Sequence, residues 1–245
     1  VESLSAPETW VRRQARRTLQ ERPLDQRGAI VETLRTWLAT LDPSGAESES
    51  SSLEALWTFL ALDTPAPDLL ERLLSARHPG VRAAACRVAG DWPGLAEDSL
   101  VARVRDPHPR VRLEAVRTLA RLQRPGTLSN ALAALSLDRD ATLDYALWLT
   151  AWERRDTWLP QLRSGQLRFL QDDSALLFVL SSAKDPAVVP AVLEILGRGA
   201  LSEADRNRAV ALLADLGGPA QLRIALDLAL ANSTRPPQAA NLLDA

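Results

Sequence analysis

The chain has 245 residues, of which 46% are hydrophobic and 24% are charged. This composition is typical of a folded globular protein and excludes a disordered chain, which would carry too few apolar residues to form a core. The formal net charge of −2 excludes the strong overall positive charge that attracts nucleic acid or anionic membranes.

The cysteine and methionine content bounds the chain further. Cys86 is the only cysteine, so an internal disulfide and a CxxC metal site are excluded and the redox compartment stays open. No apolar run reaches the roughly 18 residues of a membrane span. Because the chain lacks methionine and begins at Val1 without a charged and apolar leader, we expect a domain or processed fragment of a longer protein.

The first expected unit is a pair of helices joined by a short turn. The stretch "VRRQARRTL" at 11–19 predicts the first helix, and its partner is expected at 30–41. The following stretch "DPSGAESESSS", residues 42–52, is polar and lacks an apolar position to bury, so we expect an exposed loop within the unit.

Two later stretches show that the unit is repeated. "HPGVRAAACRVAG" begins at His78 and "HPRVRLEAVRTLA" begins at His108, an offset of 30 residues that is typical of repeat architectures. The apolar residues of the second copy fall four residues apart on one helix face, and alanine in the middle of that face lets a neighbouring helix approach closely. Proline after each histidine suits the first helical position, which places both histidines near the N-cap.

The rest of the chain parses into the same kind of helix pair. The expected first helices are 53–62, 143–152, 174–183 and 205–217, with partners at 69–76, 157–162, 185–196 and 219–230; the two "HP" helices pair with segments at 101–104 and 128–137. We therefore predict an all-α fold, a right-handed α-solenoid of about seven helical hairpins, forming one domain over 1–245. The tail 232–245 is expected to fray or to be a truncated further repeat.

Arginine occurs at the same place in three repeats. Arg12, Arg82 and Arg112 each follow the valine that begins the apolar face. We expect them to form an internal ladder that bonds backbone or acidic groups of the adjoining unit. A phosphate-binding stripe is the alternative interpretation.

Seven tryptophans outnumber phenylalanine and tyrosine together. Core packing between repeats accounts for most of them, because wide grooves need large side chains. Trp148, Trp152 and Trp158 are the candidates for exposed anchors that bind a partner protein, and the first two share a helix face.

The residues that carry catalysis or bind metal in other proteins are scarce. The two histidines occupy equivalent repeat positions, which favours a helix-start role over a catalytic one, and Cys86 aligns with Val116, which favours packing over a reactive thiol. We read the pair Asp172–Asp173 as a solvated turn and Ser202–Asp205 as a helix-capping sequence. No nucleotide, hydrolase, zinc or haem motif occurs, so we predict no enzyme activity, cofactor or metal for this chain.

The "VRxxAxR" units resemble HEAT repeats over most of the chain. More specifically, "WVRRQARRTLQER", "LEALWTFLAL", the two "HP" units and "LDYALWLTAWERRDTWLPQLRSGQL" resemble, in that order, the HEAT region of haem-binding CxxCH proteins of the PVC type. The resemblance implies a bacterial multidomain redox protein, similar to membrane-bound dehydrogenases, in which a β-propeller precedes the repeats and a c-type cytochrome follows them. It also implies a periplasmic or extracytoplasmic location. Because this chain has neither a strand-rich segment nor a CxxCH motif, we assign none of its residues to haem binding or dehydrogenase activity.

The function predicted from these observations is a scaffold or protein-interaction module that binds neighbouring domains of its parent or another protein. One alternative is a part of the active or docking surface of a cytochrome-linked dehydrogenase. A second alternative is a nucleic-acid-binding protein similar to HEAT-like DNA glycosylases, which use tryptophan, aspartate and arginine in a groove. The net charge disfavours this second alternative.

Overall fold

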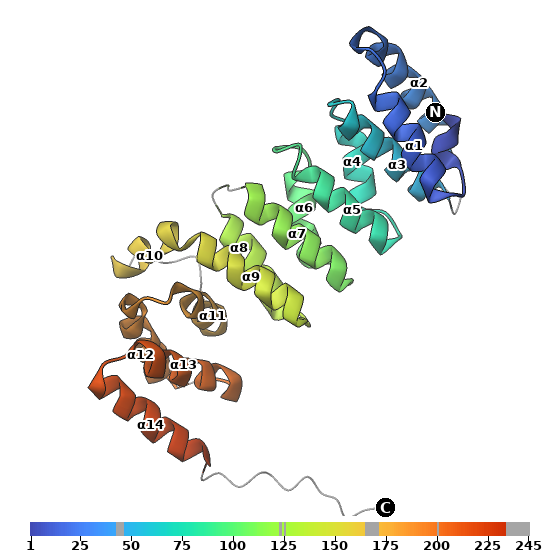
Figure 1. Ribbon diagram of the computed structural model, residues 1–245. Helices are drawn as coiled ribbons and strands as arrows, with labels where there is room; N and C mark the ends of the chain where they lie inside the picture. The colour runs from blue at the N-terminus through green and yellow to red at the C-terminus, as the bar shows by residue number, and fades with distance from the viewer. Residues whose placement is uncertain (43–46, 123, 125, 165–171, 200, 234–245) are drawn as a thin grey trace, which may run out of the picture. The chain divides into compact units, whose positions relative to one another are not determined.

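The computed structural model describes residues 1–42, 47–122, 124, 126–164, 172–199 and 201–233, and within these residues it is entirely helical (Figure 1). They form fourteen α-helices and four short 3₁₀-helices and contain no strand. The prediction of an all-α fold built from successive helices, consistent with a HEAT α-solenoid, is therefore confirmed.

The contacts between helices divide the chain into two compact units, residues 1–147 and 148–245. The first unit contains α1 (Thr9–Gln20), α2 (Arg27–Thr40), α3 (Ser48–Ala61), α4 (Pro67–Leu74), α5 (Pro79–Ala89), α6 (Glu97–Arg103), α7 (Pro109–Leu122), α8 (Thr127–Leu132) and most of α9 (Ala141–Glu153). The second contains the end of α9, then α10 (Arg155–Arg163), α11 (Asp173–Ala183), α12 (Val189–Arg198), α13 (Glu203–Leu216) and α14 (Pro219–Ser233). The expectation of one continuous repeat domain over 1–245 stays a prediction.

Successive hairpins of the first unit stack side by side (Figure 1). The helices α1, α3, α5 and α7 contact one another in that order, and α4 contacts α6 in a second row. The end of α5 lies close against α7, since a Cβ on Gly90 would come within 3.0 Å of the Thr118 side chain of α7. Val111 and Cys86 are fully buried. Burial raises the pKa of the Cys86 thiol to about 12, so this residue packs as an apolar group.

The two histidines begin their helices as the sequence predicts. His78 is the N-cap of α5, and its Nδ1 accepts a hydrogen bond from the Gly80 amide at 3.1 Å. His108 precedes α7, and its Nδ1 accepts from the Arg110 amide at 3.3 Å. Each imidazole therefore satisfies one of the amides that a helix N-terminus leaves without a partner.

The predicted boundary of the exposed loop at 42–52 is wrong at its C-terminal end. Helix α3 begins at Ser48, and the side chains of Ser51 and Ser52 are buried. The Ser51 hydroxyl lies 3.3 Å from that of Ser5, and Ser52 accepts a bond of 3.4 Å from Arg72. Serine is small enough to enter the packed interface, where these neighbours satisfy its hydroxyl. Residues 43–46 lie outside the described residues.

Helix ends in the second unit follow local capping rules. Ser202 is the N-cap of α13, and its Oγ accepts from the Asp205 amide, so the predicted capping role is confirmed. Asp172, expected in a solvated turn, is instead the N-cap of α11, and Asp173 begins that helix. Their carboxylates suit this place because a helix N-terminus favours negative charge. The start of the tail expected at 232–245 is wrong, since α14 extends to Ser233; residues 234–245 lie outside the described residues.

Candidate interaction site

The three repeat arginines make the same pair of backbone bonds. The Nη1 of each donates to the carbonyl oxygens six and five residues earlier, at distances of 2.7–3.0 Å. The acceptors are Ala6 and Pro7 for Arg12, Ala76 and Arg77 for Arg82, and Asp106 and Pro107 for Arg112. Each arginine thus fastens the start of its own helix to the turn before it. We refer to these three residues as the arginine ladder.

The other side of each guanidinium faces the next hairpin, and here the rungs differ. Arg82 holds Asp106 with two parallel bonds of 2.8 Å, from Nε and Nη2. Arg12 donates from Nε to Glu54 of α3 at 3.0 Å. On this side Arg112 donates from Nη2 alone, to the carbonyl oxygen of Asp138, and its Nε is buried without a hydrogen-bond partner. The third rung therefore lacks the carboxylate that the first two have.

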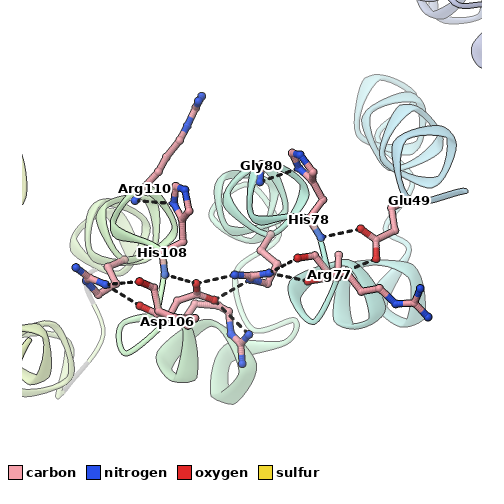
Figure 2. Close-up of polar contacts among 12 residues, drawn as sticks. Glu49, Arg77, His78, Gly80, Asp106, His108 and Arg110 are labelled. Atoms are coloured by element: carbon pink, nitrogen blue, oxygen red, sulfur yellow. Dashed lines mark hydrogen bonds and ion pairs between the residues drawn. The ribbon is translucent and has the colours of Figure 1, made fainter. Parts of the chain in front are cut away.

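Asp106 is the centre of a group of polar contacts at the start of α7 (Figure 2). Its side chain is fully buried, and besides Arg82 it accepts from the His108 amide at 3.0 Å and lies 3.5 Å from Arg103. Desolvation by burial raises the pKa of Asp106, but the bonds from Arg82 and His108 and the charge of Arg103 outweigh it, so the net pKa lies below its ordinary value. The carboxylate stays charged and joins α5, α6 and α7.

The acid that supports the start of α5 comes from a different helix. The position 30 residues before Asp106 is Ala76, which has no carboxylate. Glu49 of α3 supplies it instead, accepting from the amides of Arg77 and His78 at 2.7 and 2.9 Å (Figure 2). Desolvation raises the pKa of Glu49, but these two backbone bonds outweigh it and lower the net value. Glu49 at α5 and Asp106 at α7 thus have the same role, accepting hydrogen bonds from amides at the helix start, although their sequence positions are unrelated.

A cleft of about 490 Å³ lies beside the third rung. It is formed by the turn before α7 and the turn before α9. The lining residues are Arg105, Asp106, Pro107, Pro109, Arg112, Leu137, Asp138, Arg139 and Asp140. Sequence reasoning missed this cleft, because its two walls are turns whose approach depends on how successive hairpins stack.

The alternative interpretation of the arginines as a phosphate-binding stripe has little support in this geometry. Arg12 and Arg82 are occupied by carboxylates, and Arg112 is only 5% exposed. A guanidinium that is already paired with a buried carboxylate would have to give up that pair to bind a phosphate.

The three candidate tryptophans differ in exposure. Trp158 is 1% exposed, and its Nε1 donates to the Ala151 carbonyl at 2.8 Å, so the prediction that it is a surface anchor is wrong. Its polar atom is satisfied inside the second unit, which allows the whole indole to be buried. Trp152 is 37% exposed, and Trp148 is partly buried.

The remaining two indoles form a stack, and a cation lies over each ring. The rings of Trp148 and Trp152 lie 6.4 Å apart with an interplanar angle of 12°. Arg155 lies 4.2 Å from the Trp152 ring centre, and Lys184 lies 5.9 Å from that of Trp148. Such contacts stabilise the stack by about 0.5–1 kcal/mol each at exposed sites. A partner that approaches Trp152 therefore meets the edge of the stack together with positive charge.

Over the described ranges, no group of three or more histidine, cysteine, aspartate or glutamate side chains is arranged to hold a metal ion. Among the helices that the structure describes, none is long and apolar enough to cross a membrane.

Comparison with known families identifies the central part of the chain. Residues 66–148 match the family of HEAT repeats, and this region runs from the start of α4 into α9. It contains the second and third rungs of the ladder and the whole cleft. No curated protein and no solved structure gives a significant match to the chain.

Proposed function

We propose that this chain is a non-catalytic scaffold that binds a protein partner through its stacked HEAT-type hairpins. The observation that carries the proposal is the HEAT-repeat region at 66–148, because arrays of this kind present extended helical surfaces to other proteins. The polar chemistry of the first unit supports it, since the ladder arginines and the acids Glu54 and Asp106 are used to join helices to one another.

A photo-crosslinking experiment in cells of the source organism tests this proposal. A photoreactive phenylalanine analogue in place of Trp152 would lie at the exposed edge of the tryptophan stack. We expect a covalent adduct with one defined protein. The same analogue in place of Arg22, which is exposed in the turn after α1, is the matched control and should give no such adduct. Adducts of equal yield at both positions, or none at either, would contradict a specific binding role for this face.

The finer proposal is that the array is one module of a bacterial multidomain redox protein of the haem-binding CxxCH type. It is supported by the sequence resemblance described above. In such a protein the haem must be held by another domain, because covalent attachment needs two cysteines and this chain has one. The part played here would be to place the redox domains and to offer a docking surface.

Reading the coding sequence on both sides of this chain tests the finer proposal directly. A CxxCH motif after the repeats and a strand-rich region before them are the expected result. If both are found, the chain should bind the separately purified flanking domains in a calorimeter at about 100 μM, where a Kd in the micromolar range is measurable. Flanking sequences that lack both features would overturn the redox assignment and leave the scaffold proposal intact.

A further inference from the structure

The second and third rungs of the ladder present the same fork of donors to different acceptors. In Arg82, the Nε and Nη2 groups face both oxygens of Asp106. In Arg112, the same two groups have one acceptor between them, the carbonyl oxygen of Asp138 at Nη2. A planar guanidinium edge matches a carboxylate in two bonds, whereas a single carbonyl satisfies half of it. The third rung is therefore incomplete.

The residue that corresponds to Asp106 meets the third rung through its backbone. Asp106 lies three residues before α7 begins, and the residue three before α9 is Asp138. Arg112 donates to the carbonyl oxygen of Asp138, whose side chain is exposed. Leaving a buried donor without a partner costs about 1–3 kcal/mol, and more when the group is charged. An acceptor that bonds the Nε group of Arg112 would therefore recover this free energy, which the folded chain by itself loses.

The cleft beside Arg112 gives such an acceptor a way in. It opens between the turn before α7 and the turn that contains Asp138, and it has room for a side chain with a carboxylate end. The Nε atom is covered in this structure, so a bound carboxylate must replace the Asp138 carbonyl at Nη2 and bond Nε beside it.

The charges around the cleft decide which ligand it suits. Asp106 is neutralised by Arg82 and Arg103, and Arg139 is paired with Asp144. The remaining lining charges are Arg105, Arg112, Asp138 and Asp140, and both aspartates are exposed. Asp140 also accepts from the Leu143 amide at 2.8 Å, which holds it at the start of α9. The buried end of the cleft is therefore cationic and its rim is acidic, which favours one inserted carboxylate over a polyanion.

We propose that this cleft binds the carboxylate of an aspartate or glutamate side chain from the protein partner, which completes the third rung of the ladder. The inference rests on the proposed function for the source of that side chain. Its geometry comes from the second rung, where Asp106 already makes the same contact from within the chain.

Nuclear magnetic resonance of the arginine Nε–H groups in the full chain tests the proposal. The probe is blocked aspartate, N-acetyl-aspartyl amide, and its isosteric control is N-acetyl-asparaginyl amide. We expect the Arg112 Nε–H signal to shift with blocked aspartate and not with the asparagine analogue. A concentration up to about 200 mM is suitable, because hydrogen bonds to a charged group correspond to a Kd of about 6–80 mM. Arg82 is the internal control, since its fork is filled and its signal should not move.

The outcomes separate the proposal from its competitors. No shift at Arg112, or equal shifts with both probes, would overturn the carboxylate site. Succinate is tested alongside; binding of succinate more than about tenfold tighter than blocked aspartate would assign the cleft to a small free acid and overturn the partner side chain as its ligand. If blocked aspartate binds while the Trp152 crosslink yields no protein, the scaffold proposal fails and the carboxylate site stands.

Two variants at the rim sharpen the test without touching the ladder. Asp138→Asn removes a negative charge and should tighten binding of blocked aspartate about two- to fivefold, whereas Arg105→Gln should weaken it by a similar factor. Both side chains are exposed, so the variants are expected to fold. A large loss of thermal stability in Asp138→Asn would show that the Asp138 carboxylate itself completes the rung, and this result would overturn the proposal.

Discussion

The two compact units of the chain place their joining arginines differently. In residues 1–147, arginines at a fixed repeat position bind backbone carbonyls of their own unit and a carboxylate or carbonyl of the next. In residues 148–245, the arginines that bind carboxylates of other elements lie at the ends of α10 and α12, where Arg163 pairs with Asp185 and Arg198 with Asp173. Bonds of other side chains add to them, such as that between Ser174 and Asp205 at 3.0 Å and that from Trp158 to Ala151. Both units are nevertheless built from paired helices.

This difference shows which part of the repeat is needed for the fold. The feature common to both units is an apolar face on each helix, represented by Val111 and Leu119 in the first unit and by Leu177 and Leu213 in the second. Burying such faces between neighbouring hairpins stabilises the stack by about 25 cal/mol per Å² of apolar surface. The ladder adds a fixed register between successive hairpins of the first unit. We expect loss of the apolar face to cost more than loss of a ladder contact.

The largest effect is expected from a charge placed in the apolar face. Val111→Asp puts an unpaired carboxylate at a fully buried position between α5 and α7, and it should destabilise the chain by more than about 4 kcal/mol. Chemical denaturation followed by circular dichroism measures this. Ala102→Asp, an exposed position on α6, is the control and should change stability by less than about 0.5 kcal/mol. Equal effects would show that the assigned apolar face is wrong.

Removing the central carboxylate of the ladder should have the next largest effect. Asp106→Asn leaves Arg82 and Arg103 without their negative partner at a site that is fully buried, and we expect a loss of about 3 kcal/mol. Asp98→Asn, on the exposed first turn of α6, should lose no more than about 1 kcal/mol through the helix dipole. If the two variants have the same melting temperature, the ladder fixes the register between hairpins but does not contribute to the stability of the chain.

The repeated parts of the fold could be predicted because identical residues at a constant period leave few alternatives. The pairs His78–Pro79 and His108–Pro109 fix where α5 and α7 begin, and the spacing of apolar residues gives the buried face of each helix. The backbone half of the ladder follows from the same repeat, since each arginine reaches only residues of its own turn.

The partners from other helices could not be predicted in this way. Glu54 and Glu49 lie 42 and 29 residues from the groups that they bind, and neither belongs to a repeated sequence motif. Asp106 carries a weak signal, because an aspartate in a turn commonly accepts a hydrogen bond from the amide two residues later, as it does here from His108. The burial of Trp158 could not be predicted for a related reason: the exposure of a side chain on the short helix α10 depends on the neighbouring helices, which the sequence does not give.

A smaller effect is expected from acid, through two carboxylates of the first unit. Desolvation raises the pKa of Glu114, but its bond to Arg87 and the charges of Arg87, Arg117 and Arg110 together outweigh it, so the net pKa lies below normal, as does that of Asp106. Their stabilising contribution is complete above the unfolded-state pKa of about 4 and is lost as the pH falls through the lower folded-state pKa. Denaturation at pH 7, 5, 4 and 3 should show stability falling only below about pH 4. In Asp106→Asn the free energy of unfolding should fall less steeply with decreasing pH than in the wild-type chain. The same pH dependence in both would contradict the assignment of this effect to the Asp106 carboxylate.

The smallest effects are expected from two glycines that end α12 in the second unit, where backbone conformation replaces the ladder in fixing a turn. Gly199 is the C-cap with φ of 78°, in the left-handed region that disfavours other residues. Gly197 lies within the helix, and a Cβ on either glycine would meet nothing within 4 Å. Gly199→Ala should therefore destabilise the chain by about 1 kcal/mol through backbone strain alone, whereas Gly197→Ala should stabilise it by about 0.5–1 kcal/mol through helix propensity. Thermal melts of the two variants beside the wild-type chain measure both changes, and shifts of the same sign would show that α12 does not end in the left-handed turn described.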